Sequence, residues 1–215
     1  MRGGVFALLL ALCSTAFAQR ADVGLVDFVS GNVSFTPSAG PSNLVQAFMK
    51  VREGDRFDLP AGAQLRVVFY EGARQERWVG PASLKAKRET GELISGKAAQ
   101  VSVLPIGVQQ HISRVPEFIQ LAKLGGTSIG GSIMRPRAIR LEQPATLRAA
   151  RSTYAQMQRE MPADDITPEL YLYAVMYDFQ LYDEMKPVVA EMRRKQPEND
   201  DIKALETWVV ARQPR

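Results

Sequence analysis

The spacing of apolar residues changes once along this chain, and the change constrains what it can fold into. From Val23 to about Leu104 apolar and polar residues alternate in short runs, as they do around Val33, Leu65 and Leu84. A period of two residues is typical of half-buried strands. From Thr146 onward the apolar residues recur at a spacing of 3.6, which is typical of amphipathic helices. The sequence therefore predicts an α+β chain, in which an all-β sandwich or roll precedes an all-α domain.

Turn segments that contain glycine separate the predicted strands. Glycine permits the positive φ of tight turns, and short strands divided in this way favour an all-β sandwich or barrel. The segments are Ser30-Gly31-Asn32, Glu53-Gly54-Asp55, Pro60-Ala61-Gly62, Glu71-Gly72 and Gly80-Pro81.

The helical signals begin after this region. We predict helices over 116–124, 146–161, 167–179, 183–195 and 200–212. Thr167 is expected to cap the third of them, with Pro168 in its first turn. The acidic pairs Asp164-Asp165 and Asp200-Asp201 each precede a helix, where capping and the helix dipole explain them. Segment 105–143 contains one short helix and a glycine-rich run, and is predicted to be a linker.

The first eighteen residues have the three parts of a secretory signal. Arg2 precedes an apolar run, and Ala16-Phe17-Ala18 fits a signal-peptidase site. The stretch is too short for a membrane span, which needs about 20 apolar residues. A lipoprotein acylated at Cys13 is an alternative, which the bulky Leu12 before it disfavours. We therefore expect cleavage before Gln19 and a periplasmic or secreted bacterial protein with a β domain over 19–104 and a helical domain over 144–215.

Loss of the signal restricts the chemistry of the remaining chain. It removes Cys13, the sole cysteine, and leaves 26 basic against 23 acidic residues. Without cysteine there are no thiol nucleophiles, thiolate metal sites or disulfides. The small net charge and the expected export argue against nucleic acid as a partner. No later segment is apolar enough to predict a transmembrane helix, and no cofactor is expected.

The order of turns and strands resembles the FecR-type periplasmic domain. The segments are "VGLVDFVSGNVSF" and "VREGDRFDLPAGAQLRVVFYEGARQERWVGPASLKA", within residues of about 23–104. The resemblance implies a β fold exposed to the periplasm. Iron-sensing regulators of this family place an anti-sigma segment and a transmembrane helix before the domain, where this chain has the expected signal. Only the fold is therefore carried over. The matching motifs are Gly54-Asp55, Ala61-Gly62-Ala63, Glu71-Gly72, and Gly80, Ser83 and Leu84.

Two parts of the helical region resemble each other. "YAQMQREMPADDITPEL" aligns with "VAEMRRKQPENDDIKAL" at an offset of 35, which pairs Met157 with Met192 and Pro162 with Pro197. Tetratricopeptide units recur near 34 residues, so the region resembles a degenerate repeat of that kind. An ordinary four-helix bundle with coincidental spacing is the alternative. Leu172, Met176, Tyr182, Met185, Val189, Met192 and Pro197 occupy the core and stop positions of the repeat.

Few residues suggest catalysis. His111 is the sole histidine, and in Gln109-Gln110-His111 it is expected at the surface or at an interface. The chain is therefore predicted not to be an enzyme. Aromatic and basic side chains suggest contacts instead, with a protein partner or an anionic polymer. The candidate contacts are Tyr171, Tyr173, Tyr177, Arg135, Arg137 and Arg140.

These features favour an exported interaction module of the cell envelope. In this hypothesis the β domain associates with an envelope component and the helical repeat holds a protein partner. One alternative is a periplasmic ligand sensor that feeds a transmembrane regulator. Another is a peptidoglycan- or glycan-binding protein with Arg77 and Trp78 as contacts, although Trp78 is more readily explained as a core residue.

Overall fold

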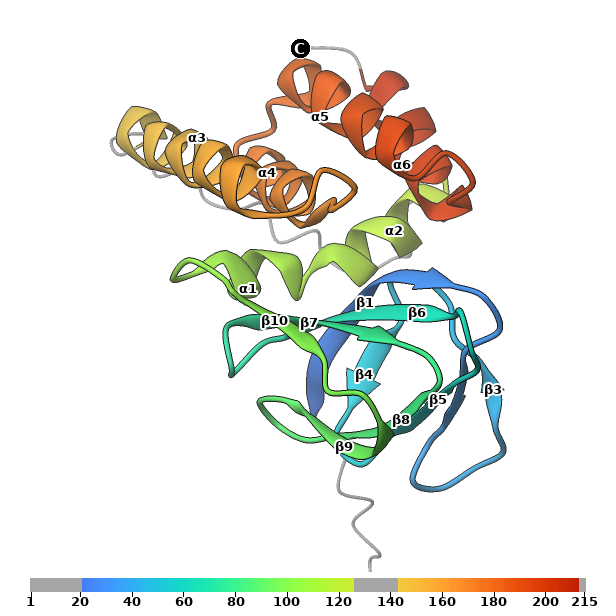
Figure 1. Ribbon diagram of the computed structural model, residues 1–215. Helices are drawn as coiled ribbons and strands as arrows, with labels where there is room; N and C mark the ends of the chain where they lie inside the picture. The colour runs from blue at the N-terminus through green and yellow to red at the C-terminus, as the bar shows by residue number, and fades with distance from the viewer. Residues whose placement is uncertain (1–20, 126–142, 213–215) are drawn as a thin grey trace, which may run out of the picture.

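The computed structural model describes residues 21–125 and 143–212, in which a β-sandwich carries two layers of helices on one face (Figure 1). Its strands are β1 (Asp22–Ser30), β2 (Ser34–Thr36), β3 (Asn43–Leu44), β4 (Lys50–Arg52), β5 (Arg56–Leu59), β6 (Gln64–Phe69), β7 (Arg74–Val79), β8 (Ala82–Ala86), β9 (Gly91–Gly96) and β10 (Gln100–Val103). One five-stranded sheet has the order β10-β7-β6-β1-β4, and the other has the order β3-β2-β5-β8-β9. All pairs are antiparallel.

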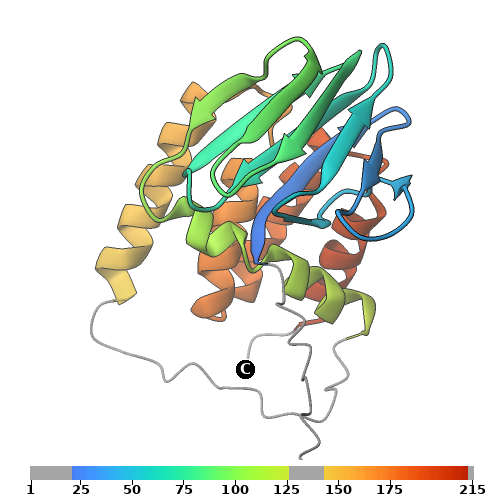
Figure 2. The same ribbon diagram turned by 90° about the horizontal axis from the view of Figure 1, so that it is seen from below.

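The helices all follow the strands in the chain. They are α1 (Val108–Ile112), α2 (Val115–Lys123), α3 (Gln143–Glu160), α4 (Thr167–Asp178), α5 (Tyr182–Lys195) and α6 (Asp200–Val210). Helices α1 and α2 lie directly on the sheet that contains β1, β6 and β7, and α3 to α6 form the layer beyond them (Figures 1 and 2). The prediction of an α+β chain is confirmed, with helix bounds close to those expected.

Strand β6 shows why one sheet lies inside the molecule. Leu65, Val67 and Phe69 alternate along it and face the core between the two sheets. The alternate positions, Arg66 and Val68, face the helices and are only 2% and 0% exposed. The sequence predicted that this second face would meet solvent, and that prediction is wrong, because the helical layers cover it.

Helices α1 and α2 correct the prediction of a linker over 105–143. Val108, Ile112 and Phe118 are buried and share a core cluster with Leu25 and Val68 of the sheet. The same cluster contains buried side chains of α3 to α6. Residues 105–125 therefore join the sandwich to the outer helices through one continuous core. The glycine-rich run from 126 onward lies outside the described residues.

Helix α4 is the centre of the helical part. All of its residues from Thr167 to Met176 are buried, and it packs between α3 and α5 with α1 beneath it. A helix that is buried on all sides needs apolar or paired polar side chains on every face. None of the helices in the described ranges is long and apolar enough to cross a membrane.

Candidate functional site

A buried ionic cluster joins the sheet to the helices. Arg66 of β6 lies between Asp27 of β1 and Asp165 of the loop before α4, and both carboxylates are 0% exposed. Its Nε donates to Asp27 Oδ2 at 2.9 Å. Its Nη2 lies 3.4 Å from Asp165 Oδ1. One guanidinium thus serves two carboxylates, so the cluster carries a net negative charge when both are ionised.

Neutral side chains complete the cluster around one carboxylate oxygen. Asp27 Oδ2 accepts hydrogen bonds from Thr167 Oγ1 at 2.8 Å and from Gln75 Nε2 at 3.0 Å, besides the one from Arg66. Gln75 Nε2 also lies 2.6 Å from Thr167 Oγ1. The other oxygen, Asp27 Oδ1, and Asp165 Oδ2 have no hydrogen-bond partner. The cluster is therefore only partly satisfied, which is costly at such burial.

The electrostatics of Asp27 follow from this environment. Burial raises the pKa of Asp27 to about 6, with a further increase from Asp165, while Arg66 and Thr167 act in the opposite direction. For Arg66, burial lowers the pKa, but the charges of Asp27 and Asp165 outweigh burial and raise it above its ordinary value. Arg66 therefore stays charged, and Asp27 titrates close to neutrality.

The cluster also explains how α4 begins. The sequence predicted Thr167 as the N-cap, but the N-cap residue is Ile166. Asp165 Oδ1 instead accepts the Thr167 backbone N–H at 2.8 Å, so the expected capping role of the acidic pair is confirmed for Asp165. This leaves the Thr167 hydroxyl free to reach across to Asp27. The N-cap prediction for Thr167 is wrong, because the Thr167 hydroxyl donates to Asp27 of the distant strand β1 and does not cap its own helix.

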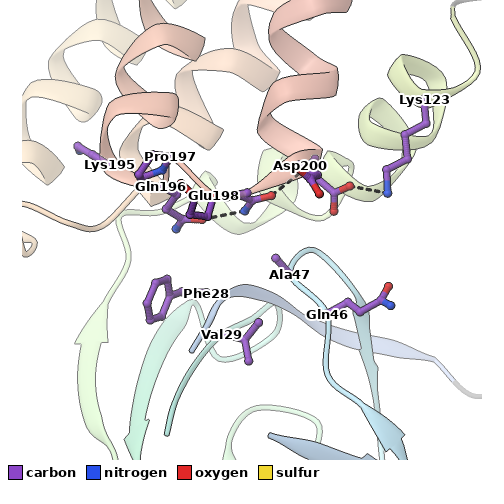
Figure 3. Close-up of a pocket in the computed structure, with 12 residues that line it drawn as sticks. Phe28, Val29, Gln46, Ala47, Lys123, Lys195, Gln196, Pro197, Glu198 and Asp200 are labelled. Atoms are coloured by element: carbon purple, nitrogen blue, oxygen red, sulfur yellow. Dashed lines mark hydrogen bonds and ion pairs between the residues drawn. The ribbon is translucent and has the colours of Figure 1, made fainter. Parts of the chain in front are cut away.

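A groove of about 560 Å³ opens beside this cluster (Figure 3). One wall comes from the sandwich and presents Phe28, Val29, Gln46 and Ala47. The opposite wall comes from the α5–α6 connection, residues 195–201, with Lys123 of α2 at one end. One wall is mostly apolar and the other is polar, and the volume lies in the range of ordinary ligand sites.

Two contacts connect the groove to the cluster behind it. The Arg66 guanidinium lies 5.3 Å from the centre of the Phe28 ring. Gln196 Nε2 donates to the Asp27 backbone oxygen at 3.4 Å, and Gln196 Oε1 accepts from Asn199 at 2.8 Å. Asn199 in turn caps α6 by accepting the Asp201 N–H at 3.1 Å. The groove wall is thus fixed to both the sheet and α6.

Most charges of the groove are already paired. Lys195 Nζ donates to Glu169 Oε2 and to the Asp165 backbone oxygen, each at 2.8 Å. Lys123 pairs with Asp201, and Asp200 pairs with Lys203 at 2.7 Å. Glu198 is exposed, and no described residue supplies it with an ion pair. It is therefore the groove charge that remains available to a partner.

The tyrosines expected to contact a partner lie mostly inside the helical part. Tyr171 and Tyr173 are 8% and 1% exposed, so they are core residues and the prediction of a contact surface is corrected. They are buried because α4 is covered on all sides. Tyr177 is half-buried and stacks against Phe118 and Trp208, with ring centres 4.4 and 5.7 Å away. Arg135, Arg137 and Arg140 lie outside the described residues.

The other residues singled out in the sequence, Trp78, Arg77 and His111, each contact another side chain of the fold. Trp78 is buried, as expected, and donates to Glu76 at 3.2 Å, so it is no glycan contact. Arg77 lies on the helix-facing side and donates to Gln64 at 2.7 Å. His111 is half-buried against Tyr171, and burial lowers its pKa. Within residues 21–125 and 143–212, no group of three histidine, cysteine or acidic residues could hold a metal ion.

The cluster was missed at the sequence level although one signal was present. Asp27 interrupts the apolar run from Val23 to Val29, where a lone acid in a buried strand needs a partner. Its partner Arg66 looked like a residue of a solvent-facing strand side, and Gln196 carried no signal. Comparisons with protein-family models, with characterised proteins and with solved structures found no match for this chain.

Proposed function

We propose that this chain is an exported, non-enzymatic binding protein of the bacterial cell envelope, and that the groove holds an extended segment of a partner protein. The observation that carries this proposal is the placement of the groove at the junction of the sheet and the helices. A groove whose two walls are fixed by one buried cluster is preorganised, so little conformational entropy is lost on binding.

The lining of the groove suggests the chemistry of the partner segment. Phe28, Val29 and Ala47 offer an apolar wall, which suits an aliphatic or aromatic side chain. Glu198 on the opposite wall suits a basic group, and Gln46 offers an amide for backbone hydrogen bonds. A segment in which a basic residue lies close to an apolar one would satisfy both walls.

The proposed assignment to the envelope has independent support in the sequence. It depends on the signal-like first eighteen residues and on the resemblance to FecR-type domains. Gly31, Gly54 and Gly62, at three of the expected turns, have φ of +78°, +91° and +80°, which is consistent with that pattern.

We further propose that α3 to α6 are a degenerate tetratricopeptide-like array. Each helix packs against the next in chain order, and the aligned residues Met157 and Met192 are both buried. Both α3 and α5 end just before the aligned prolines, Pro162 and Pro197. These similarities support a repeat rather than an arbitrary bundle.

Site-specific photo-crosslinking in cells tests the groove. A photoreactive phenylalanine analogue is placed at Gln46 or Glu198 on opposite walls, and at Gln156 on the exposed side of α3 as the control. We expect one discrete adduct from both groove positions and none of it from Gln156. The same adduct from all three positions, or none from the groove, would reject the proposed site.

Export has a separate test. Cell fractionation followed by N-terminal sequencing of the purified protein should give a chain that begins at Gln19. A cytoplasmic chain that retains Met1 would contradict the envelope assignment without affecting the groove.

A further inference from the structure

The edge of the sandwich formed by β10 combines exposed apolar side chains with an absence of charge. Five of the nine large hydrophobic side chains exposed among the described residues lie between 93 and 106. They are Leu93, Ile94, Val101, Val103 and Ile106, of which Val103 is 81% exposed. Together they expose about 300 Å² of apolar surface, at roughly 100 Å² for a fully exposed aliphatic side chain. Val101 and Val103 lie on one face of β10, and exposed apolar patches often mark interaction sites.

Strands β9 and β10 lie at the same side of the sandwich. Only residues 97–99 connect them, and each strand lies at an edge of its own sheet. Glu76 links the two edges, because it pairs in register with Val101 of β10 and accepts the Gly91 N–H of β9 at 2.9 Å. Among the described strands β10 pairs with β7 alone, so its other side has backbone groups available for a further strand.

Strand β10 itself lacks the protection that sheet edges normally have, and Pro105 lies two residues beyond its end. Natural edge strands carry charges, prolines or bulges that prevent pairing with another chain. At the opposite end of the same sheet, β4 follows that rule with Lys50 and Arg52. Residues 98–113, which contain β10, include no lysine, arginine, aspartate or glutamate. The two ends of one sheet therefore differ, and only the β10 end is left open to pairing.

We propose that β10 pairs with β10 of a second copy of this chain in an antiparallel, two-fold arrangement. In a two-fold interface the residues near the axis lie close to their own copies, so a charged edge would repel itself and an uncharged one does not. In the register centred on Ser102, Val101 faces Val103 of the other copy, and the reverse pair repeats the contact. Both valines lie on the same face of the sheet, because their partners on β7 are Glu76 and Arg74.

The pairing makes one continuous sheet from two copies and covers Val101 and Val103, the exposed apolar positions of β10. Its apolar area is small beside the roughly 800 Å² per partner of a standard interface. We therefore expect association at micromolar concentrations. The dimer does not depend on the groove, which lies beside β1, three strands away from β10 in the order of the sheet.

Disulfide trapping tests the register directly. In the full chain carrying Cys13→Ser, the substitution Ser102→Cys introduces the sole cysteine, so any disulfide must join two copies. Directly opposite residues of an antiparallel pair have Cα atoms about 4.5–5.5 Å apart, which a disulfide can span. Gln100→Cys is the matched control, because it is exposed on the same face but faces Leu104 of the other copy. We expect covalent dimer from Ser102→Cys and little from Gln100→Cys. Equal trapping of both would overturn the register.

Sedimentation velocity at about 1 to 100 μM tests the dimer itself. We expect a monomer–dimer equilibrium whose dissociation constant rises at least about tenfold in Val103→Lys, because two lysines then face the same small patch. Leu44→Lys, which changes a leucine that is 64% exposed on the short β3 edge, should leave the equilibrium unchanged. A wild-type chain that stays monomeric at the highest concentration would overturn the proposal. A dimer that Val103→Lys leaves intact would do so as well.

Discussion

Replacing Asp27 by asparagine should remove a large part of the pH dependence of stability. In the folded chain the pKa of Asp27 is raised from 3.8 to about 6, mainly by burial. A carboxyl whose pKa is raised on folding binds its proton more tightly in the folded state. Its contribution to stability is therefore complete below about pH 4 and is lost as the pH rises through 6.

The magnitude follows from the size of the shift. A change of about two pKa units corresponds to about 3 kcal/mol in total, and about 2 kcal/mol of it falls between pH 4.5 and 7.5. Asparagine keeps the shape of the side chain and does not titrate. The difference in unfolding free energy, wild type minus Asp27→Asn, should therefore fall by about 2 kcal/mol over that pH range.

Urea unfolding followed by tryptophan fluorescence provides the measurement, because Trp78 and Trp208 are buried in the sandwich and in the helices respectively. Asp164→Asn is the matched control: it removes a neighbouring carboxylate that is exposed, so it should keep the wild-type pH profile. A difference that is flat with pH would refute the reasoning. A difference that rises with pH would show that Arg66 and the other two donors to Asp27, Gln75 and Thr167, outweigh its burial.

Three further predictions concern the packing. Tyr173→Phe should change the unfolding free energy by less than about 0.5 kcal/mol, since the buried hydroxyl has no hydrogen-bond partner. Tyr173→Ala should lower the unfolding free energy by about 3–5 kcal/mol, because it removes a buried ring. Equal losses for the two variants in urea unfolding would contradict this. Glu76→Gln should lower the unfolding free energy by about 2–3 kcal/mol and shift the fluorescence emission of Trp78, because the carboxylate accepts hydrogen bonds from Trp78, Thr90 and Gly91. An unchanged emission spectrum and an unchanged urea midpoint would argue against these hydrogen bonds. The sandwich and helices should also unfold together, so far-ultraviolet circular dichroism and fluorescence should give one midpoint, and two separated midpoints would show that the shared core does not couple them.

The local elements could be predicted from the sequence because their information is local. The bounds of α2 and α4 differ by at most one residue at either end from those expected from apolar spacing and from proline in the first turn. Ile202, Leu205, Trp208 and Val209 recur at the helical spacing on one side of α6, and all four are buried. Strand positions such as Leu65, Val67 and Phe69 followed from alternation. A period depends only on neighbours in the chain, so one sequence is enough to read it.

The candidate site depended on contacts that no local pattern records. Alternation along β6 shows that one face is apolar, but it does not show what covers the other face. Helices more than 40 residues later in the chain cover it, and so Arg66 became a buried ion between Asp27 and Asp165 instead of a solvated side chain. By itself, the sequence determined which segments are strands and which are helices. Only the tertiary structure decided which polar residues leave water, because burial depends on the packing of distant segments.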